Sequence, residues 1–515
     1  MFDKLVRRRL RLIYKGYKYL KDQKQSDYLT HLEEVLTTTN LEKTNLGLSC
    51  LQGVDEELLV RQYLTVRLLG LRFKQSVLYS IGSKVPLRYP LPKEWRVALT
   101  ESGVDVDHFR SKFLWGLYHF IFFGKGVRYG LRSIYSLFSQ NSNLGNYVYF
   151  DGLSNNLNGN CISNNPQSHN IINWYLRWEN GVENIDSICH SVDNQSDFEL
   201  FNIRVKKASS LPRLDGFESF KYTCLIFYLF FFSILSITSR PYRSFLLEER
   251  IKAIKVSIAK KSNLAKDYLF NNSSAVYRPL WTYVAKHAGS RVLFYFYSVN
   301  DEGYKQGEKY EKYNLLYLMS WSHYLAWDEF HVNFLRRIGH GNSIIEKVGV
   351  TWFSSSDADI DIPKNSIAVF DVTPRKYLMY VMYGPYPEYR TYDITNHFLS
   401  DIFIATSEIS MYMAHKVKRI NKSTSIKYLR RLRQLKEEAF YLEVHPSVDA
   451  TQVIQRTKAC ISSPFTSTAL IAKLEGKPSI YYDPTGMIQG DDRAAHGIPV
   501  ITELRELRKW VEQLD

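Results

Sequence analysis

The chain of 515 residues is 45% hydrophobic and 23% charged, a composition typical of folded globular proteins that excludes an intrinsically disordered chain. Its length allows roughly two to four domains. The formal net charge of +15 favours polyanionic partners, among them nucleic acids, anionic lipid head groups and phosphorylated substrates, but does not choose among them.

Residues 1–144 are predicted to form a helical N-terminal region, because apolar residues recur in them at helical spacing. At the start of this region, basic residues between Arg7 and Lys21 alternate with Leu, Ile and Tyr. This pattern indicates a basic amphipathic helix that could lie on an anionic membrane surface. The alternative, a helix whose basic face is simply solvated, stays open.

An α/β domain is predicted over residues 145–350. It begins with the apolar strand Tyr147–Phe150, which is followed by Asp151, Gly152 and a loop rich in Asn, Ser and Gly. Further along, a helix and a glycine-containing turn precede the strand Val292–Tyr297. This order of elements is that of an α/β unit.

The segment 222–239 within this domain contains no charged residue. Its length is at the lower limit for a membrane-spanning helix. Basic residues flank it on both sides, so the charge rule gives no orientation for a span. We expect a buried helix, or one that dips into the membrane interface, in preference to a span.

Residues 362–515 are predicted to form a second α/β domain with a parallel, doubly wound sheet, since short apolar strands alternate regularly with helices. The expected strands are 367–372, 415–420 (a short or edge strand), 441–446, 459–463 and 478–483.

Polar and basic residues follow these strands, and ligands of such sheets bind beyond the carboxyl ends of the strands. The run "SSPFTST" (462–468) turns one strand into a helix, whose N–H groups and positive dipole end make an anion site together with the hydroxyl groups. Lys418 and Arg419 add charge-assisted bonds to a phosphate, and His445 is expected beside the turn. The alternatives are plain helix capping for the hydroxyl groups and a structural role for His445.

Several common catalytic motifs are absent. The sequence has no GxxxxGK[ST] loop, no strand–GxGxxG–helix unit and no GxSxG or HExxH, which disfavours P-loop NTPases, dinucleotide oxidoreductases, α/β-hydrolases and zincins. The five cysteines are scattered without a CxxC pair, and no carboxylate cage is apparent, so no metal site is predicted. The cysteine usage fits a reducing cytoplasm, and no RNP-like or helix-turn-helix pattern supports nucleic-acid binding.

The stretch "HPS…CISSPFTSTALIAKLEGKPSIYYDPTG" resembles the bacterial surface-polysaccharide biosynthesis proteins that are named for their PFTS motif. Pro464-Phe465-Thr466-Ser467 is that motif verbatim. The stretches "SIAVFDV", "KVKR", "WSHYLAWDEFHVNFLRRIG" and "VYRPLW" also resemble this family. The resemblance covers roughly residues 145–515 and is strongest from residue 362 onward.

More distantly, an HP pair followed by a Ser-Ser/Thr turn is similar to transferases that use CMP-activated sugars, the bacterial sialyltransferases and capsule Kdo transferases. This resemblance implies two Rossmann-like domains (GT-B-like), no metal or other cofactor, and a CMP phosphate held by the histidine and the serine turn. The implied phosphate-binding residues are His445, Pro446, Ser462 and Ser463, with Thr466 and Ser467 nearby.

In some of those sialyltransferases an Asp-Gly pair after an early strand supplies the catalytic base, and Asp151-Gly152 is the counterpart here. The sequence departs from that pattern at Phe150, where a second acidic residue is usual. A carboxylate at this position would remove the acceptor hydroxyl proton. The alternatives are an Asx-turn role for Asp151 and, as other acids, Asp328 and Glu329, which could instead cap a helix.

The sequence therefore predicts a GT-B-like glycosyltransferase of bacterial surface polysaccharide (O-antigen or capsule) biosynthesis, with Asp151 and His445 in catalysis. The donor would be a CMP-activated acidic sugar or, alternatively, a UDP- or GDP-sugar; the acceptor would be a glycan or lipid-linked glycan. The protein would lie at the cytoplasmic face of the inner membrane as a peripheral protein. A non-catalytic, membrane-associated assembly protein of the same pathway is the alternative.

Overall fold

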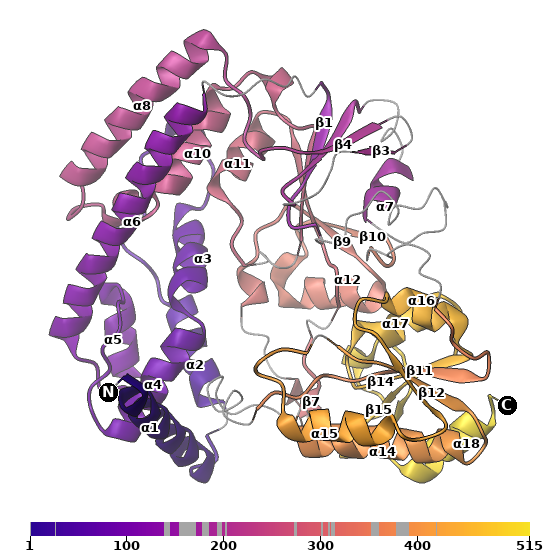
Figure 1. The fold of residues 1–515 in the computed structure, drawn as a ribbon. Coiled ribbons are helices and arrows are strands. Elements are labelled where there is room, and N and C mark those ends of the chain that lie inside the picture. The colour runs from indigo at the N-terminus through magenta and orange to yellow at the C-terminus, as the bar shows by residue number, and fades with distance from the viewer. Residues whose placement is uncertain are drawn as a thin grey trace.

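The fold is seen in a computed structural model that describes residues 2–25, 27–137, 145–153, 171–177, 185–192, 198–200, 203–271, 276–299, 302–306, 309–310, 315–351, 360–376, 391–418 and 420–514. A helical N-terminal region is followed by two α/β domains, each built on its own sheet (Figure 1). The predicted fold class, two Rossmann-like domains with a helical N-terminal region, is confirmed.

The N-terminal region is helical, as its periodicity predicts. Asp55 and Asp107 each cap a helix by accepting a backbone N–H bond, from Leu58 and Arg110 respectively. The elements are α1 (Phe2–Asp22), α2 (Tyr28–Thr38), η1 (Ser49–Leu51), α3 (Glu56–Leu68), α4 (Leu71–Ser83), α5 (Lys93–Glu101) and α6 (His108–Ser136).

The first α/β domain contains an eight-stranded sheet in the order β10-β9-β6-β5-β1-β2-β4-β3, in which only β3 runs antiparallel to its neighbour. The sheet grows outward in both directions from β1, so its topological switch point lies between β1 and β5. The strands are β1 (Tyr147–Phe150), β2 (Ser187–His190), β3 (Phe198–Leu200), β4 (Ile203–Lys207), β5 (Asp267–Asn271), β6 (Arg291–Tyr295), β9 (His323–Ala326) and β10 (Ile344–Lys347).

Helices and a small hairpin accompany this sheet. The helices are α7 (Ile171–Arg177), α8 (Gly216–Leu235), α9 (Pro241–Phe245), α10 (Leu247–Ile258), η3 (Lys261–Asn263), α11 (Leu280–His287), η5 (Leu316–Leu318), α12 (Glu329–Leu335) and η6 (Arg336–His340). The hairpin consists of β7 (Lys305–Gln306) and β8 (Lys309–Tyr310).

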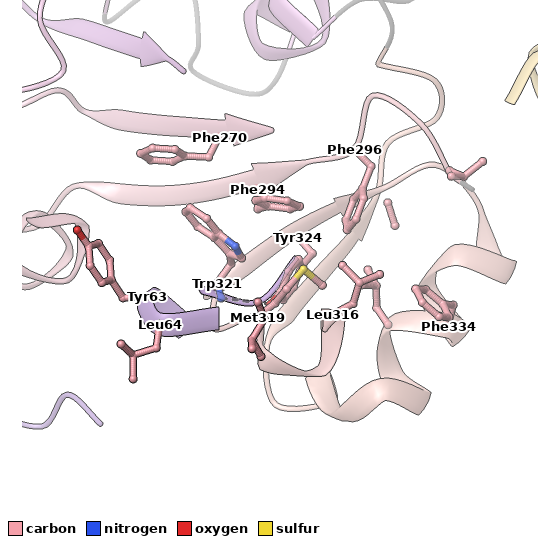
Figure 2. Close-up of a cluster of buried hydrophobic side chains, with 14 of the residues drawn as sticks. Tyr63, Leu64, Phe270, Phe294, Phe296, Leu316, Met319, Trp321, Tyr324 and Phe334 are labelled. Atoms are coloured by element: carbon pink, nitrogen blue, oxygen red, sulfur yellow. Dashed lines mark hydrogen bonds between the residues drawn. The ribbon is translucent and has the colours of Figure 1, made fainter. Parts of the chain in front are cut away.

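The N-terminal helices share a core with this first domain. Figure 2 shows Tyr63 of α3 near the aromatic side chains that line one face of the sheet. There Trp321 packs against Phe270 and Phe294, with ring centroids 5.0 and 4.9 Å apart. All four residues are buried. The helical region is therefore packed onto the first domain and is not a separate appendage.

The second α/β domain has a six-stranded parallel sheet in the order β13-β12-β11-β14-β15-β16. Counted along the chain, this is the Rossmann order 3-2-1-4-5-6, with the switch point between β11 and β14. Its strands are β11 (Ser366–Phe370), β12 (Tyr412–Lys416), β13 (Tyr441–Val444), β14 (Ala459–Ser462), β15 (Ser479–Tyr482) and β16 (Val500–Ile501). Its helices are α14 (Tyr392–Ser407), α15 (Ile426–Leu435), α16 (Ala450–Arg456), α17 (Ser467–Leu474), η8 (Arg493–Ala495) and α18 (Leu504–Glu512).

Two sequence-based expectations need correction. The strand expected at 415–420 as a possible edge strand is β12, which starts earlier and pairs on both sides. The uncharged segment 222–239 does lie largely in a helix, α8, but the alternative that this helix is buried is wrong, since its buried residues form only a narrow stripe. Among the described residues, α8 alone is long and apolar enough to cross a membrane, which by itself is weak evidence for a span.

Candidate functional site

The turn that carries the PFTS motif lies at the switch point of the second domain. Ser462 ends β14 and is fully buried, and the N–H of Ser463 donates to the carbonyl of Phe370 at the end of β11 (2.8 Å). The carbonyl of Ser463 then accepts two bonds from Thr466, one from its N–H (3.3 Å) and one from its hydroxyl (2.8 Å). This tight turn sets the start of α17 at the carboxyl edge of the sheet.

Phe465 occupies the strained position of this turn. Its φ is +57°, in the left-handed region that residues with a side chain adopt only at a cost of about 1–2 kcal/mol. Its ring is buried and stacks on Tyr304 of the first domain, with centroids 6.2 Å apart and planes at 19°. The Phe465 ring also meets the ring of Tyr481 of β15 edge-on, with centroids 5.7 Å apart. Packing between the two domains therefore holds Phe465 in place.

The hydroxyl groups of the turn mainly bond one another. Those of Ser462 and Thr468 share a hydrogen bond (2.9 Å), and the Thr468 hydroxyl also meets that of Thr466 (3.2 Å). The Ser467 hydroxyl accepts the N–H of Val299 from the first domain (3.4 Å). Thr466, the N-cap of α17, makes no side-chain cap bond to the helix. The hydroxyl groups thus shape the turn, and the anion-binding capacity lies with the backbone N–H groups at the start of α17.

His445 follows β13, which is the edge strand of the sheet. Its exposed ring contacts Ser447 at Nδ1, with the Ser447 hydroxyl at 2.6 Å and the Ser447 N–H donating at 3.2 Å, so Nε2 is the ring nitrogen that could meet a ligand. β12 and β11 separate β13 from β14, which amounts to about 14 Å at the usual strand spacing. The expectation that His445 lies beside the serine turn is therefore wrong: residues that are close in chain order end on strands that are not neighbours.

Lys416 and Lys418 belong to the end of β12, the strand that lies between β13 and β11 in the sheet. Lys416 Nζ donates to the carbonyl of Pro446 (3.5 Å) and thereby ties the β12 and β13 ends together. Lys418 is exposed just beyond β12. Arg419 lies outside the described residues.

A buried polar cluster beneath this edge was not predicted from the sequence. Asp371, at the end of β11, accepts a hydrogen bond from Tyr428 (2.6 Å) and lies 3.5 Å from Nε2 of His415. His415 in turn bonds Tyr441 through Nδ1 (2.9 Å). Burial, and then the Asp371 carboxylate, raises the pKa of Tyr428, which keeps it protonated as a donor. The one sequence signal was a histidine that directly follows the apolar residues Met413 and Ala414.

A small pocket opens at the switch point. Asp371, Ser463, Pro464 and Asp483 line it together with side chains of α14. Asp483 also organises the loop after β15, since its carboxylate accepts the N–H groups of Thr485 (3.0 Å) and Ile488 (3.0 Å). The pocket therefore joins the ends of β11, β14 and β15, where a Rossmann-type sheet binds its ligand.

Asp151 lies at the corresponding switch point of the first domain. Its N–H donates to the carbonyl of Leu269 (2.8 Å), and burial raises the pKa of its half-buried carboxyl group. Gly152 has φ +65°, and a Cβ there would lie 2.5 Å from the Asn271 amide nitrogen, which donates to the Gly152 carbonyl. No bond from a neighbouring backbone N–H to the Asp151 carboxylate is seen among the described residues, so the turn depends on Gly152 and Asn271.

The alternative acids have structural partners. Asp328 caps α12 by accepting the N–H of His331 (2.8 Å) and pairs with Nδ1 of His496 from the second domain (2.8 Å). Although burial opposes it, the hydrogen bond and charge of His496 lower the pKa of Asp328. Glu329 is exposed near Arg336. Capping, the alternative to catalysis, is thus what Asp328 does.

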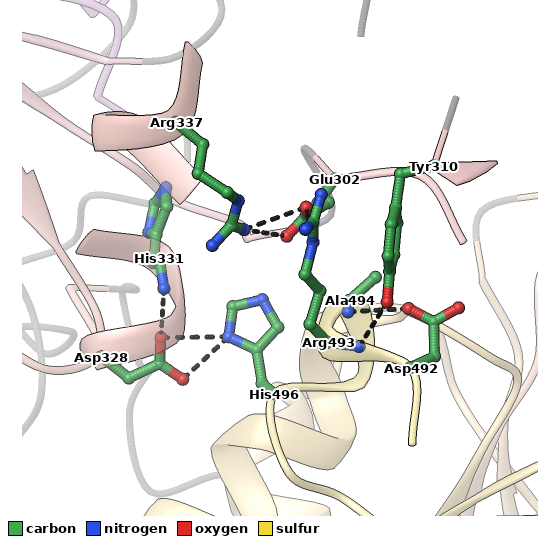
Figure 3. A network of polar contacts seen from close by, with 9 residues as sticks. All are labelled: Glu302, Tyr310, Asp328, His331, Arg337, Asp492, Arg493, Ala494 and His496. Atoms are coloured by element: carbon green, nitrogen blue, oxygen red, sulfur yellow. Dashed lines mark hydrogen bonds and ion pairs between the residues drawn. The ribbon is translucent and has the colours of Figure 1, made fainter. Parts of the chain in front are cut away.

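A polar network links the two domains next to this pair (Figure 3). Glu302 of the first domain binds Arg337 of its own domain (2.8 Å) and Arg493 of the second (2.5 Å). Arg493 also lies over the ring of Tyr310, 3.6 Å from its centroid. Asp492 accepts the N–H of Lys305 (2.7 Å). Among the described residues, no group of three or more His, Cys, Asp or Glu side chains could hold a metal ion.

The fold defines a class: a protein of two Rossmann-ordered α/β domains, in which a helix, α17, starts at the switch point of the second sheet. Residues 227–511, more than half of the chain, match the family described as "Polysaccharide biosynthesis PFTS motif protein". The chain belongs to this family, and the predicted resemblance is confirmed.

Solved structures show distant likeness. HepE from Anabaena, in complex with UDP and glucose, has a TM-score of 0.36 and 10% identity, over 71% of this chain and 89% of that one. A UDP-glucosyltransferase from Polygonum tinctorium has a TM-score of 0.33 and 10% identity, over 72% and 93%. TarM has a TM-score of 0.31 and 9% identity, and the match spans about half of each chain, 51%. No curated protein matches the sequence significantly.

Proposed function

We propose that this protein is a metal-independent glycosyltransferase that transfers a sugar from a nucleotide-sugar donor to a glycan during bacterial surface polysaccharide biosynthesis, of O-antigen or capsule. Membership of the PFTS motif family supports the pathway. The observation that carries the reaction class is the start of α17 at the switch point of a Rossmann-ordered sheet. There the N–H groups and the helix dipole favour a phosphate.

The proposed donor is a CMP-activated acidic sugar, with a UDP- or GDP-sugar as the alternative. The phosphate would lie at the start of α17, near Ser463 and Thr466. Because His445 follows β13, which β12 and β11 separate from β14, one phosphate is too short to reach both groups. The donor would therefore lie along the sheet edge, and Nε2 of His445 would donate to a different part of the same molecule.

In the proposed reaction Asp151 is the general base. Its half-buried carboxylate has a raised pKa, which makes it a better proton acceptor than an exposed aspartate. As the acceptor oxygen forms its bond to the sugar, Asp151 takes the hydroxyl proton, and the nucleotide leaves with the electron pair of the broken bond. The acceptor would be a glycan or a lipid-linked glycan, and the protein would lie peripherally at the cytoplasmic face of the inner membrane.

A thermal-shift panel of CMP, CDP, UDP, GDP and their sugars tests the donor proposal. We expect CMP compounds to raise Tm most, since ligands that bind only the folded state stabilise it. His445→Ala should reduce that shift, whereas His397→Ala, at an exposed histidine of α14, should leave it unchanged. A shift with UDP or GDP alone would contradict the CMP donor. No shift with any nucleotide would favour the non-catalytic assembly protein.

A further inference from the structure

The outer surface of α8 is aromatic where a soluble protein would carry polar residues. Its buried residues, Tyr222, Ile226, Leu229 and Ser233, form one stripe along the helix. Most of the remaining circumference is exposed and apolar. The exposed large apolar residues are Phe217, Phe220, Phe227, Tyr228, Phe231, Phe232, Ile234 and Leu235.

The neighbouring helix α6 continues this surface. Figure 1 shows α6 and α8 side by side along the flank of the molecule that lies away from the second domain. The two helices touch where Ser133 bonds Tyr222 (2.8 Å) and where Gly130 lies against Phe230. The exposed large apolar residues of α6 are Phe109, Phe113, Leu117, Phe120, Ile121, Leu131 and Tyr135.

The charge of α6 decides what can cover this surface. The helix contains no acidic residue, and its basic residues are all exposed; they are Arg110, Lys112, Lys125, Arg128 and Arg132. A second copy of the chain packed symmetrically on this face would set like charges against each other. An anionic lipid surface complements both features, because aromatic rings lie at the boundary of head groups and acyl chains while basic side chains contact the phosphates.

Contacts on the inner side of α8 hold it against the protein. The buried Arg250 of α10 donates to the Ser233 hydroxyl of α8 (2.7 Å) and to the carbonyl of Arg243 (3.0 Å). A helix that crossed the bilayer would give up this bond and the packing around Tyr222 and Ile226. The contacts therefore favour a helix that lies flat on the membrane over one that spans it.

We infer that the outer faces of α6 and α8 form a docking surface that lies flat on an anionic lipid bilayer. This inference specifies the membrane contact in the proposed function and does not depend on the identity of the donor. It also assigns the main contact to α6 and α8 and not to the basic helix α1.

Flotation of the full chain with lipid vesicles tests the apolar part of the surface. The chain should float with vesicles that contain a quarter phosphatidylglycerol in phosphatidylcholine, and much less with phosphatidylcholine alone. Replacing Phe227 and Phe231 together by Ser should lower the vesicle partition about tenfold or more for each ring removed. Ile426→Ser, at a 58% exposed position of α15 in the second domain, is the matched control and should leave the partition unchanged.

Charge reversal tests the basic part. Arg128→Glu combined with Arg132→Glu should remove the preference for phosphatidylglycerol and its weakening by salt. Arg430→Glu with Arg433→Glu, two exposed positions of α15, should change neither. Each variant should keep the wild-type Tm and the wild-type rise in Tm on nucleotide binding. A lowered Tm would reveal a folding defect, and a missing rise in Tm in the wild type would reveal a failure of the donor proposal, so both are distinguished from a loss of vesicle binding.

Three results would overturn the docking surface itself, and a fourth would overturn its flat arrangement on the membrane. The first is a wild-type chain that does not float with either vesicle, and the second is equal flotation of the surface variants and their controls. The third is a wild-type dimer that the Phe227/Phe231 variant dissociates in sedimentation, without any vesicle binding. Resistance of membrane-bound protein to alkaline carbonate extraction would contradict the flat arrangement and favour a span.

Discussion

At Phe465 we expect a substitution by glycine to destabilise the protein less than a substitution by alanine, the reverse of the usual order. Its left-handed backbone disfavours any residue with a Cβ, while its buried ring packs against Tyr304 and Tyr481. Phe465→Ala loses the ring and keeps the strain, whereas Phe465→Gly loses the ring and relieves it. Both variants should be less stable than the wild type, by about 3–5 kcal/mol for the alanine. In denaturant unfolding, the free energy of unfolding of the glycine variant should exceed that of the alanine variant by about 1 kcal/mol. A more stable alanine variant would show that the turn is unstrained in solution.

At Asp151 the predicted effects on stability and turnover have opposite signs. Burial raises the pKa of Asp151 in the folded state, so ionisation destabilises the fold as the pH rises through that pKa. Asp151→Asn should therefore raise Tm at neutral pH, and this advantage should vanish at a pH below the ordinary aspartate pKa of 3.8. The same variant should lose turnover and keep donor binding. Glu329→Gln, at an exposed carboxylate, is the control; an active Asp151→Asn enzyme would contradict the assignment of the base.

At the scale of elements, glycines fix the crossing of α1 and α4. A Cβ at Gly16 would lie 2.0 Å from the Leu78 carbonyl oxygen, and one at Gly82 would lie 1.9 Å from that of Leu12. Gly16→Ala should therefore detach α1 and allow it to unfold, so that trypsin can cleave the chain at its basic residues, whose side chains are already exposed. Gly124→Ala is the matched control, because its Cβ would meet nothing within 4 Å, and alanine should slightly stabilise α6. Equal trypsin cleavage of both variants would mean that α1 is not held by this crossing.

The same scale shows what the sequence could and could not predict. Most strands and helices of the second domain were predictable because short apolar runs end at Pro, Ser or Asp and alternate with helical spacing; β12, which ends on His415 and Lys416, was placed too late in the sequence, and β16 was not expected. The order of the strands in the sheet was not predictable, since it depends on crossover geometry. The expected position of His445 beside Ser463 was therefore wrong. The expectation that α8 is buried was wrong because an uncharged aromatic run is equally compatible with a protein core and with a lipid interface. The cluster around Asp371 joins residues from three strands and a helix, and no local pattern reveals it.

For the whole molecule, the network around Glu302 should govern how the two domains are held together. Glu302 is nearly buried and binds arginines of both domains, so removing Arg493 leaves part of its carboxylate unpaired. Arg493→Met should loosen the interface, which X-ray scattering would show as a larger radius of gyration. Arg508→Met breaks an exposed pair with Glu408 inside the second domain and should have no such effect. Unchanged scattering of the Arg493 variant would mean that the aromatic contacts of Phe465 suffice.

The position of Phe465 between the domains has a thermodynamic consequence. In the proposed function one short turn would supply the N–H groups for the donor phosphate, and through Phe465 and Ser467 the same turn touches Tyr304 and Val299 of the other domain. A change in the relative position of the domains must then alter the affinity of the turn for an anion. By reciprocity, an anion bound there must bias the position of the domains by the same free energy. The motif that gives the family its name would in this way act as a coupler between substrate occupancy and domain closure.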